Sequence, residues 1–314
     1  MVFHMTATIR DRLRPYLYLL PAAVVLGVFS ILPLVYGLGV SLCRFGIAFE
    51  RFVWLGNYYR AFTDAEFHQS LLVTVYYVIG TVPAGLILSY AVAGLLFQNL
   101  RARGMYRTIY FLPYVTSTVA AAAVWKWIFS PGDRGLANAL LAFAGKEPLQ
   151  WVQETDSIFN VFGRLAGLQV DLPGPSLALL CVILFSIWHS LGFNIVIFLA
   201  GMSAIPRDVH EAAAIDGARG WRLARHVTIP LLSPTIFFLL VISVIKAFQA
   251  FNQIYVMISD RPPPEAQNVT MFIFSKFYNS GQVGYGSAVA FILFVIILVL
   301  TLFQMKLLGH RVHY

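Results

Sequence analysis

The sequence predicts an all-α membrane protein with six transmembrane helices, and three observations support this prediction. Of the 314 residues, 59% are hydrophobic and only 11% are charged, whereas a soluble domain carries about a quarter charged residues. Six apolar stretches reach the roughly 20 residues that a bilayer-spanning helix needs, and none of them contains an aspartate or a glutamate. They lie at about 16–43, 71–97, 109–129, 176–200, 234–258 and 286–308.

The length of the chain fits one membrane domain, 1–314, rather than several units. The first apolar stretch is too long for the apolar core of a signal peptide, and we expect it to be retained as a span. Cys43 and Cys181 lie in or at the edge of apolar stretches without metal-ligand spacing. The sequence therefore predicts no disulfide scaffold, no metal site and no catalytic residue.

The connecting segments differ in charge, and this difference predicts the orientation of the chain. One set carries twelve basic and four acidic residues; it comprises 1–15, 98–108, 201–233 and 309–314, together with Lys306. The other set carries nine basic and ten acidic residues; it comprises 44–70, 130–175 and 259–285, together with Lys126. Because lysine and arginine accumulate on the cytoplasmic side, both termini are predicted to be cytoplasmic. The overall charge of +8 then indicates topology and not nucleic-acid binding.

The longest predicted cytoplasmic loop, 205–232, begins with a short segment of small residues. Asp208 and Glu211 resemble a capping box, which predicts that a helix starts there. Ala212 and Ala213 lack bulk, so another surface can approach the backbone of this helix closely. Gly217 permits a turn before a second, basic helix.

Two interpretations of this loop follow from the residues alone. A small, capped helix at the membrane surface is suited to transmitting force to a partner protein. The alternative is an amphipathic helix on anionic lipid, because Arg219, Arg222 and Arg225 are spaced three residues apart.

Polar side chains gather in the fourth and fifth spans, where they are typical of a substrate path. The fourth span contributes Ser186, Trp188, His189, Ser190 and Asn194, and the fifth contributes Ser243, Lys246, Gln249, Asn252 and Gln253. Each residue alone could serve only an interhelical hydrogen bond, worth about 0.6 kcal/mol, but the cluster favours a path. Because no predicted span contains a carboxylate, the counter-charge of Lys246 must come from a partner subunit, water or an anionic substrate.

The loop also resembles the signature of ABC importer permeases. Glu211, Ala212, Ala213 and Gly217 match its Glu-Ala-Ala-x-x-x-Gly core. Three further segments, GNYYRAF (56–62), MYRTIYFLPYV (105–115) and GYGSAVAF (284–291), resemble the carbohydrate permeases of the maltose and glycerol-phosphate type. The segment 260–270, DRPPPEAQNVT, stands where these permeases usually carry Gly-Gly-Pro.

This resemblance implies the type I ABC importer permease fold and a set of site residues. The coupling helix, which docks on the ATPase subunit, corresponds to Glu211, Ala212, Ala213, Asp216 and Gly217. The positions that line the substrate in the family fall on Ser186, His189, Ser190, Phe193, Ser243, Ala247 and Ala250. The last two are alanine where the maltose permease has polar side chains, which argues against maltose itself.

The resemblance further implies a membrane protein complex in the bacterial inner membrane. Its other members are a second, homologous permease, two ATP-binding subunits that carry ATP and magnesium, and an external solute-binding protein. The chain has no G-x-x-x-x-G-K-[ST] loop, so we expect a permease without an ATPase site or a cofactor of its own.

The predicted function is translocation of a sugar or oligosaccharide delivered by the external binding protein. Import of glycerol 3-phosphate or another anionic sugar derivative is the alternative. An ATP-independent channel or secondary transporter is the alternative of a different class, but such proteins more often show internal repeats or acidic residues within their spans.

Overall fold

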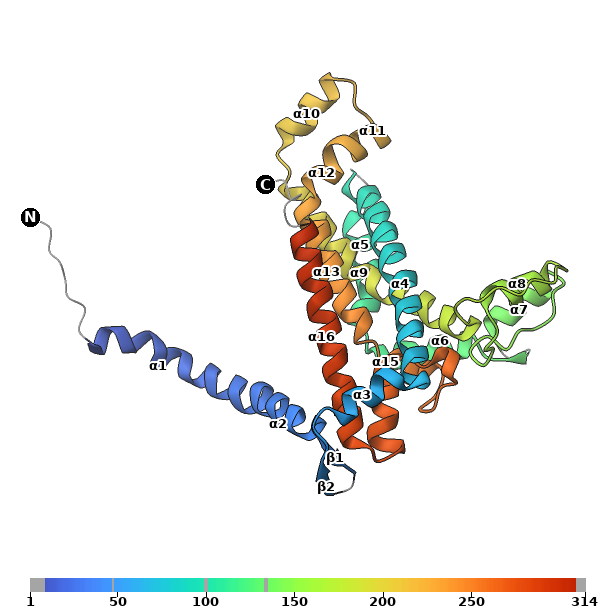
Figure 1. The fold of residues 1–314 in the computed structure, drawn as a ribbon. Coiled ribbons are helices and arrows are strands. Elements are labelled where there is room, and N and C mark those ends of the chain that lie inside the picture. The colour runs from blue at the N-terminus through green and yellow to red at the C-terminus, as the bar shows by residue number, and fades with distance from the viewer. Residues whose placement is uncertain (1–8, 47, 99–100, 133–134, 309–314) are drawn as a thin grey trace, which may run out of the picture. The chain divides into compact units, whose positions relative to one another are not determined.

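The computed structural model describes residues 9–46, 48–98, 101–132 and 135–308 (Figure 1). It is mostly helical, and its contacts group the chain into two compact units. Within the described residues, four helices are long and apolar enough to cross a membrane, or up to six if each of two bent helix pairs forms one span. Each predicted span overlaps one of these elements, although 234–258 covers only the second helix of the pair Trp221–Leu231 and Ser233–Phe248 and extends beyond it. Residues 1–8 and 309–314, which are parts of the predicted basic ends, lie outside the described residues.

The first unit comprises Met1–Thr63 and Lys276–Ile292. Its described elements are α1 Ile9–Leu26, the π-helical turn Gly27–Ile31, α2 Leu32–Ser41, β1 Cys43–Phe45, β2 Phe49–Phe52, α3 Gly56–Thr63 and the first part of α16 Val283–Leu308. The two strands form an antiparallel hairpin in which Cys43 pairs with Phe52 and Arg44 with Arg51. The hairpin follows directly after the candidate span Tyr18–Ser41, which corresponds to the predicted span 16–43.

The second unit comprises Asp64–Ser275 and Leu293–Tyr314. Its described helices are α4 Ala65–Phe97, α5 Arg103–Val115, α6 Thr118–Ile128, α7 Leu136–Phe143, α8 Ile158–Leu165, α9 Leu177–Ala204, α10 Arg207–Ile215, α11 Trp221–Leu223, α12 Ile229–Leu231, α13 Ser233–Phe248, α14 Asn252–Met257, α15 Val269–Phe274 and the end of α16. Side-chain caps fix the starts of the two longest, since Asp64 accepts from Glu66 N at 2.9 Å and Ser176 from Leu179 N at 3.2 Å.

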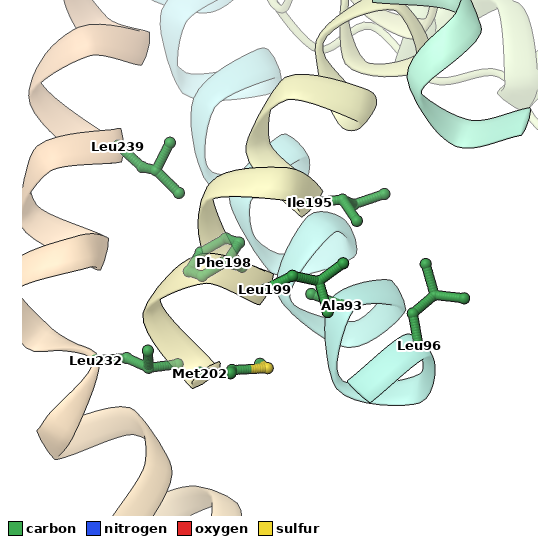
Figure 2. Close-up of a cluster of buried hydrophobic side chains, with 8 residues drawn as sticks. All are labelled: Ala93, Leu96, Ile195, Phe198, Leu199, Met202, Leu232 and Leu239. Atoms are coloured by element: carbon green, nitrogen blue, oxygen red, sulfur yellow. The ribbon is translucent and has the colours of Figure 1, made fainter. Parts of the chain in front are cut away.

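Helix α9 is the central helix of the second unit and packs between α4 and α13. Figure 2 shows the contact, with Phe198 and Met202 on α9 lying between Leu232 and Leu239 on one side and Ala93 on the other. In a bilayer, apolar side chains gain little by leaving lipid, so close packing stabilises such contacts. Small residues allow that closeness: a Cβ added at Gly192 would lie 2.8 Å from Phe111 Cα of α5.

Two of the predicted spans are not straight helices. The predicted span 109–129 is divided into α5 and α6, which are inclined at 96°. Thr116 takes an extended conformation with ψ at 150°, and Pro113 weakens the preceding turn because it has no N–H to donate.

The predicted span 234–258 is likewise interrupted, since α13 ends at Phe248 and α14 begins at Asn252. Phe251 is not helical, with φ at −135°. The carbonyl of Ala250 accepts hydrogen bonds from Asn268 Nδ2 at 2.6 Å and from Thr270 Oγ1. These side chains satisfy a backbone group that the interrupted helix leaves open.

The helix in the predicted loop 205–232 exists, but its predicted capping box does not. Helix α10 begins at Arg207, so its N-cap is Pro206 and not Asp208, and Pro206 makes no side-chain cap hydrogen bond. Its other end is a Schellman motif, in which Ala218 N donates to Ala213 O at 2.9 Å and Gly217 N donates to Ala214 O at 3.1 Å. Gly217 has φ at +76°, so the turn predicted at this glycine is confirmed. A second helical segment follows, from Trp221 to Leu231.

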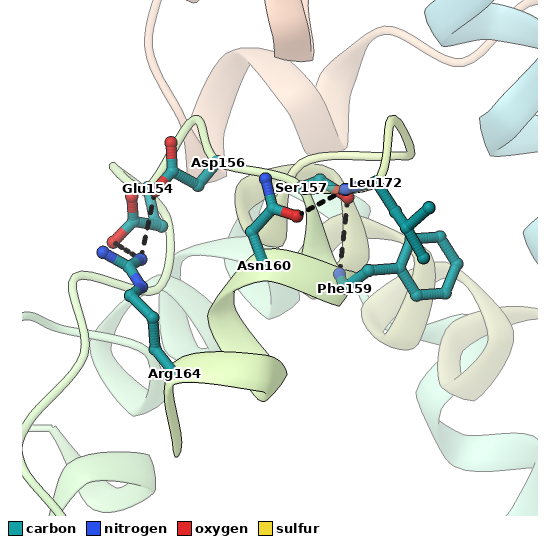
Figure 3. A network of polar contacts seen from close by, with 7 residues as sticks. All are labelled: Glu154, Asp156, Ser157, Phe159, Asn160, Arg164 and Leu172. Atoms are coloured by element: carbon teal, nitrogen blue, oxygen red, sulfur yellow. Dashed lines mark hydrogen bonds and ion pairs between the residues drawn. The ribbon is translucent and has the colours of Figure 1, made fainter. Parts of the chain in front are cut away.

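The α7–α8 segment is held together by its own polar contacts. Figure 3 shows Arg164 on α8 within 3.4 Å of Glu154 and 3.2 Å of Asp156. The buried Asn138 accepts from Leu149 N at 2.9 Å and from Trp151 Nε1 at 2.7 Å. These contacts order the described part of the segment 130–175, in which α7 and α8 are each only eight residues long. Within the second unit, α8 and α10 lie beyond opposite ends of α9 (Figure 1).

Candidate functional site

A polar cavity of about 290 Å³ lies among the helices of the second unit. Helices α4, α5, α6, α9, α13 and α14 each contribute at least one side chain to its lining. The lining is rich in hydroxyl, amide and aromatic groups and includes one cation. The polar and aromatic members are Tyr77, Thr81, Tyr114, Thr118, Phe185, Ser186, His189, Ser190, Phe193, Asn194, Ser243, Lys246 and Gln253.

One side of the cavity is a hydrogen-bond network that joins three helices. Tyr77 on α4 donates its hydroxyl proton to Ser186 Oγ on α9 at 2.7 Å. Gln253 on α14 donates from Nε2 to the same Tyr77 oxygen at 2.9 Å. Ser186 in turn donates to Val182 O at 2.7 Å. The network fixes the positions of the groups that a ligand in the cavity would meet.

The interruption after α13 places Gln253 in this network. If α13 continued without a break, the residues after Gln249 would point in other directions around the helix axis. Instead, the buried Asn268 bonds the Ala250 carbonyl and also accepts from Met271 N at 3.1 Å, which caps α15. Thr74 of α4 accepts from Val269 N at 3.0 Å. The cavity wall is therefore tied to α4 and α15 as well as to α13.

The opposite side of the cavity is aromatic and positively charged. Tyr114 on α5 stacks on Phe193 of α9 with ring centroids 5.1 Å apart. The Lys246 ammonium lies 4.4 Å from the Phe193 ring centroid and 3.4 Å from the Tyr114 hydroxyl oxygen. The two rings therefore give the cation a cation–π and a hydrogen-bonding environment. No aspartate or glutamate is among the described residues that line the cavity.

The close approach of α5 to α9 makes this aromatic side possible. Gly192 faces the backbone of Tyr110 and Phe111, and a side chain there would overlap main-chain atoms. Because Tyr114 lies one turn after Tyr110, this contact brings its ring beside Phe193. The glycine is thus a packing residue that positions an aromatic group of the site.

The structure brings together nine of the thirteen residues that the sequence predicts for the substrate path. The nine residues that line the cavity are Ser186, His189, Ser190, Phe193, Asn194, Ser243, Lys246, Ala247 and Gln253. Their role in transport stays a prediction.

The other four predicted path residues lie elsewhere. Trp188 packs on Trp125 of α6, with ring centroids 5.4 Å apart. Ala250 is buried in the turn after α13, where its carbonyl is bonded by Asn268. Gln249 and Asn252 are exposed on the described chain and border that turn. The prediction placed them in the path because it assumed an unbroken helix.

Sequence reasoning missed the contributions of the second and third spans. Tyr77, Thr81 and Gly85 on α4 recur at intervals of four residues and line the cavity, so their periodicity was an available signal. Tyr114 and Thr118 flank the bend between α5 and α6, and no sequence pattern indicated that they would face α9 and α13.

The residues predicted to couple the chain to an ATPase form a separate surface on and after α10. Glu211, Ala212 and Asp216 are exposed, whereas Ala213 is 7% exposed. Two large apolar side chains of the same loop are also exposed, Ile215 on α10 at 87% and Trp221 on α11 at 69%. The arrangement is a rigid, Schellman-terminated helix whose acidic and apolar side chains are accessible to a partner.

Comparison with known proteins gives consistent matches over nearly the whole chain. Residues 69–314 match the family described as "Binding-protein-dependent transport system inner membrane component". The trehalose/maltose transport system permease protein MalF of Thermococcus litoralis is 31% identical over 294 residues, which cover 93% of this chain and 92% of the relative. The sn-glycerol-3-phosphate transport system permease protein UgpA of Agrobacterium fabrum is 29% identical over 97% of both chains.

Solved structures give the same fold. A chain of a bacterial ABC transporter involved in the import of the acidic polysaccharide alginate superimposes with a TM-score of 0.77 at 19% identity, covering 96% of this chain and 97% of that chain. A second structure of a bacterial alginate ABC transporter, in complex with an alginate-pentasaccharide-bound periplasmic protein, gives a TM-score of 0.77 at 20% identity and covers 95% of this chain and 94% of that chain.

Proposed function

Because this chain belongs to the family of inner-membrane components of binding-protein-dependent transport systems and is an ABC importer permease, we propose that it conducts a sugar or oligosaccharide through the cavity described above. The proposal rests on the groups that line this cavity. Its hydroxyl and amide groups can bond to sugar hydroxyls, and the stacked Tyr114 and Phe193 rings offer an apolar face for a pyranose ring. Relatives named for maltose and glycerol-phosphate transport support the same class of substrate.

The size of the cavity sets how much of the substrate this chain contacts. Its volume of about 290 Å³ is near the lower end of ligand pockets, which hold roughly 300–1,000 Å³. The chain therefore contacts a small part of an oligosaccharide at a time. We infer that a second, homologous permease supplies the rest of the path.

The α10 surface is the proposed contact with the ATPase. Two ATP-binding subunits carry ATP and magnesium, one of them receives α10 in a groove, and the external binding protein delivers the substrate on the opposite side of the membrane. Exposure of Ile215 and Trp221 supports this contact, since both would be buried in it. Gly217, held at φ +76°, keeps the helix end rigid enough to transmit movement. The proposal places α10 and both termini on the cytoplasmic side.

An anionic sugar derivative, such as glycerol 3-phosphate, is the second candidate substrate. Lys246 favours it, because the ammonium has no carboxylate among the described lining residues and an unpaired cation at membrane depth is destabilising. A phosphate or carboxylate on the substrate would supply the missing charge. A carboxylate of the partner permease would do so equally well for a neutral sugar.

Uptake by the reconstituted importer with its binding protein tests the function and decides between the substrates. We expect uptake to require ATP and to be blocked by vanadate. With a neutral sugar, Lys246→Met should lose rate because a hydrogen-bond donor is removed, while Lys246→Gln retains part of it. If both variants fail only with a phosphorylated ligand, the anionic class replaces the neutral one. Lys306→Met, at the end of α16, is the matched control. Uptake that continues without ATP would contradict the importer assignment.

The coupling contact needs a separate experiment. Glu211→Lys should abolish uptake and binding-protein-stimulated ATP hydrolysis while the complex remains abundant in the membrane. Glu211→Gln should be milder, because it removes the charge without reversing it. Asp171→Lys, a charge reversal in the 130–175 segment, should transport normally. Normal uptake by Glu211→Lys would exclude a coupling role for this carboxylate.

A further inference from the structure

A second polar cavity, about 530 Å³ in volume, lies entirely within the first unit. The hairpin β1–β2, helix α3 and the turn before α16 form its walls. Three arginines and one glutamate line it, together with several neutral polar groups. The charged and amide members are Arg44, Glu50, Arg51, Arg60, Asn57 and Gln282. Neither the proposed substrate path nor the coupling surface uses any of these residues.

The walls of this cavity are fixed by hydrogen bonds and close backbone contacts. Asn57 on α3 donates from Nδ2 to Ser41 O at 2.8 Å and to Cys43 O at 2.9 Å, which ties the hairpin to α3. Gly284 lies so close to β1 that an added Cβ would be 3.0 Å from Phe45 N. Gln282 N donates to Lys276 O at 2.8 Å and closes the turn before α16. The cavity therefore exists before any ligand enters it.

The charges in the cavity are only partly compensated. Arg44 Nε lies 3.1 Å from Glu50 Oε2, so these two residues neutralise each other. Arg60 lies with its guanidinium carbon 4.1 Å from the centre of the Tyr285 ring, which restricts its orientation. Neither Arg51 nor Arg60 forms an ion pair with another described residue. Two arginines are thus available to an anion, and guanidinium groups bind phosphate with paired hydrogen bonds.

A neutral acceptor in the same cavity adds a second requirement. Gln282 Oε1 is buried and has no hydrogen-bond partner among the described residues. Such an acceptor is satisfied by a ligand that donates a hydrogen bond. A carboxylate or a bare phosphate dianion has no proton to donate, whereas a hydroxylated group beside a phosphate provides both functions.

The lining residues of the cavity lie next to the ends of two candidate spans, which indicates that the ligand comes from the membrane. Its residues begin three positions after the candidate span Tyr18–Ser41 ends, and Gln282 immediately precedes the candidate span Val283–Leu307. The cavity therefore lies at the depth of the lipid headgroups. The large apolar side chains of Phe49, Phe52 and Trp54 on and after the hairpin are exposed, Trp54 at 71%. Exposed aromatic residues at this level are typical of the membrane interface.

We propose that this cavity binds the headgroup of an anionic phospholipid whose phosphate carries a hydroxylated alcohol, as in phosphatidylglycerol. Arg51 and Arg60 donate to the phosphate oxygens, and a headgroup hydroxyl donates to Gln282 Oε1. The acyl chains lie along the apolar surface of the adjoining spans. This binding site is independent of the substrate path and of the sugar class.

Lipid retention by the purified full-length chain tests the proposal. The protein is exchanged into mixed micelles of dioleoyl phosphatidylglycerol, dioleoyl phosphatidylcholine and dioleoyl phosphatidylmethanol, and bound lipid is counted by native mass spectrometry. Wild type should retain phosphatidylglycerol over phosphatidylcholine by about tenfold or more, given the strength of charged hydrogen bonds. The Arg51→Ala/Arg60→Ala double variant should lose this preference. Arg107→Ala/Arg261→Ala, which removes two exposed arginines outside the cavity, should keep it.

The hydroxyl contact has its own comparison, because phosphatidylmethanol has the phosphate but no headgroup hydroxyl. Gln282→Leu should bind both anionic lipids equally, whereas wild type should prefer phosphatidylglycerol. Thermal unfolding provides the folding control: all variants should match wild type in phosphatidylcholine, and phosphatidylglycerol should raise the midpoint only where the cavity arginines remain. If Arg60→Ala impairs folding, Arg51→Glu alone serves in its place.

Three results would overturn the proposal. Equal retention of phosphatidylglycerol and phosphatidylcholine by wild type would show that the cavity has no headgroup preference. The same rise in midpoint with 10 mM inorganic phosphate in phosphatidylcholine would assign the site to free phosphate. Weakened association of the external binding protein in Arg51→Glu, with lipid retention unchanged, would make the cavity a protein-docking site.

Discussion

Asn268 holds the interrupted part of the second unit together, and its removal should be strongly destabilising. The side chain is fully buried, donates to Ala250 O at 2.6 Å and accepts from Met271 N at 3.1 Å as the cap of α15. Loss of a helix cap is worth about 1 kcal/mol. The Ala250 carbonyl keeps its hydrogen bond from Thr270 Oγ1, so the loss of the Asn268 bond adds about 0.5–1.5 kcal/mol. Asn268→Ala should therefore lower stability by about 1.5–2.5 kcal/mol.

For a chain of this size, each kcal/mol corresponds to about 2–4 °C in the unfolding midpoint. We expect Asn268→Ala to lower the midpoint of the detergent-solubilised protein by about 3–10 °C in a fluorescence-detected thermal assay. Asn268→Asp keeps the cap but loses the donor, so it should separate the two contributions. Transport should fall in both variants because Gln253 loses its place beside Tyr77. Asn160→Ala, which removes one hydrogen bond on α8, is the control. A midpoint within about 1 °C of wild type would refute the reasoning.

Three further predictions concern packing, coupling and topology. Gly192→Ala should destabilise the protein by about 1–3 kcal/mol through overpacking against α5, whereas Gly94→Ala, with nothing within 4 Å, should be neutral in the same thermal assay. Ala212→Trp should block ATPase association in co-purification, since it enlarges a small residue that is exposed on α10, and intact association would count against the contact. In sealed cells, Gln150→Cys should react with an impermeant thiol reagent and Arg222→Cys should not; the reverse pattern would invert the topology.

The helical spans were predictable because the length of an apolar stretch and its lack of acidic residues can be read directly along the sequence, without knowledge of contacts between distant segments. Each predicted span overlaps a helix or a bent pair of helices: 71–97 lies within α4, and 176–200 lies on α9 except for its N-cap Ser176. The break at Ala250 was not predictable in this way. It depends on Asn268, eighteen residues further along the chain, and no proline or glycine marks it.

In the candidate site, too, the features that depend on spacing along one helix were predictable, and those that depend on packing between distant segments were not. Ser186, His189, Ser190 and Asn194 share one helical face, so their common exposure to the cavity followed from spacing and from the family resemblance. Tyr114 reaches the site only because Gly192 admits the α5 backbone, which is a property of packing between distant segments. The capping box failed for a local reason: Pro206 precedes α10, and the helix starts without a side-chain cap.

Passage of the substrate through the cavity of the second unit can be tested by the reactivity of a thiol placed in its lining, in the variant Ser190→Cys. The variant is made in a Cys43→Ala/Cys181→Ala background, because these are the two native cysteines. The assembled importer is treated with a small methanethiosulfonate reagent, and ATP-driven uptake is measured before and after. The account predicts that modification abolishes uptake and that substrate delivered by the binding protein slows modification. Full uptake by completely modified protein would contradict it.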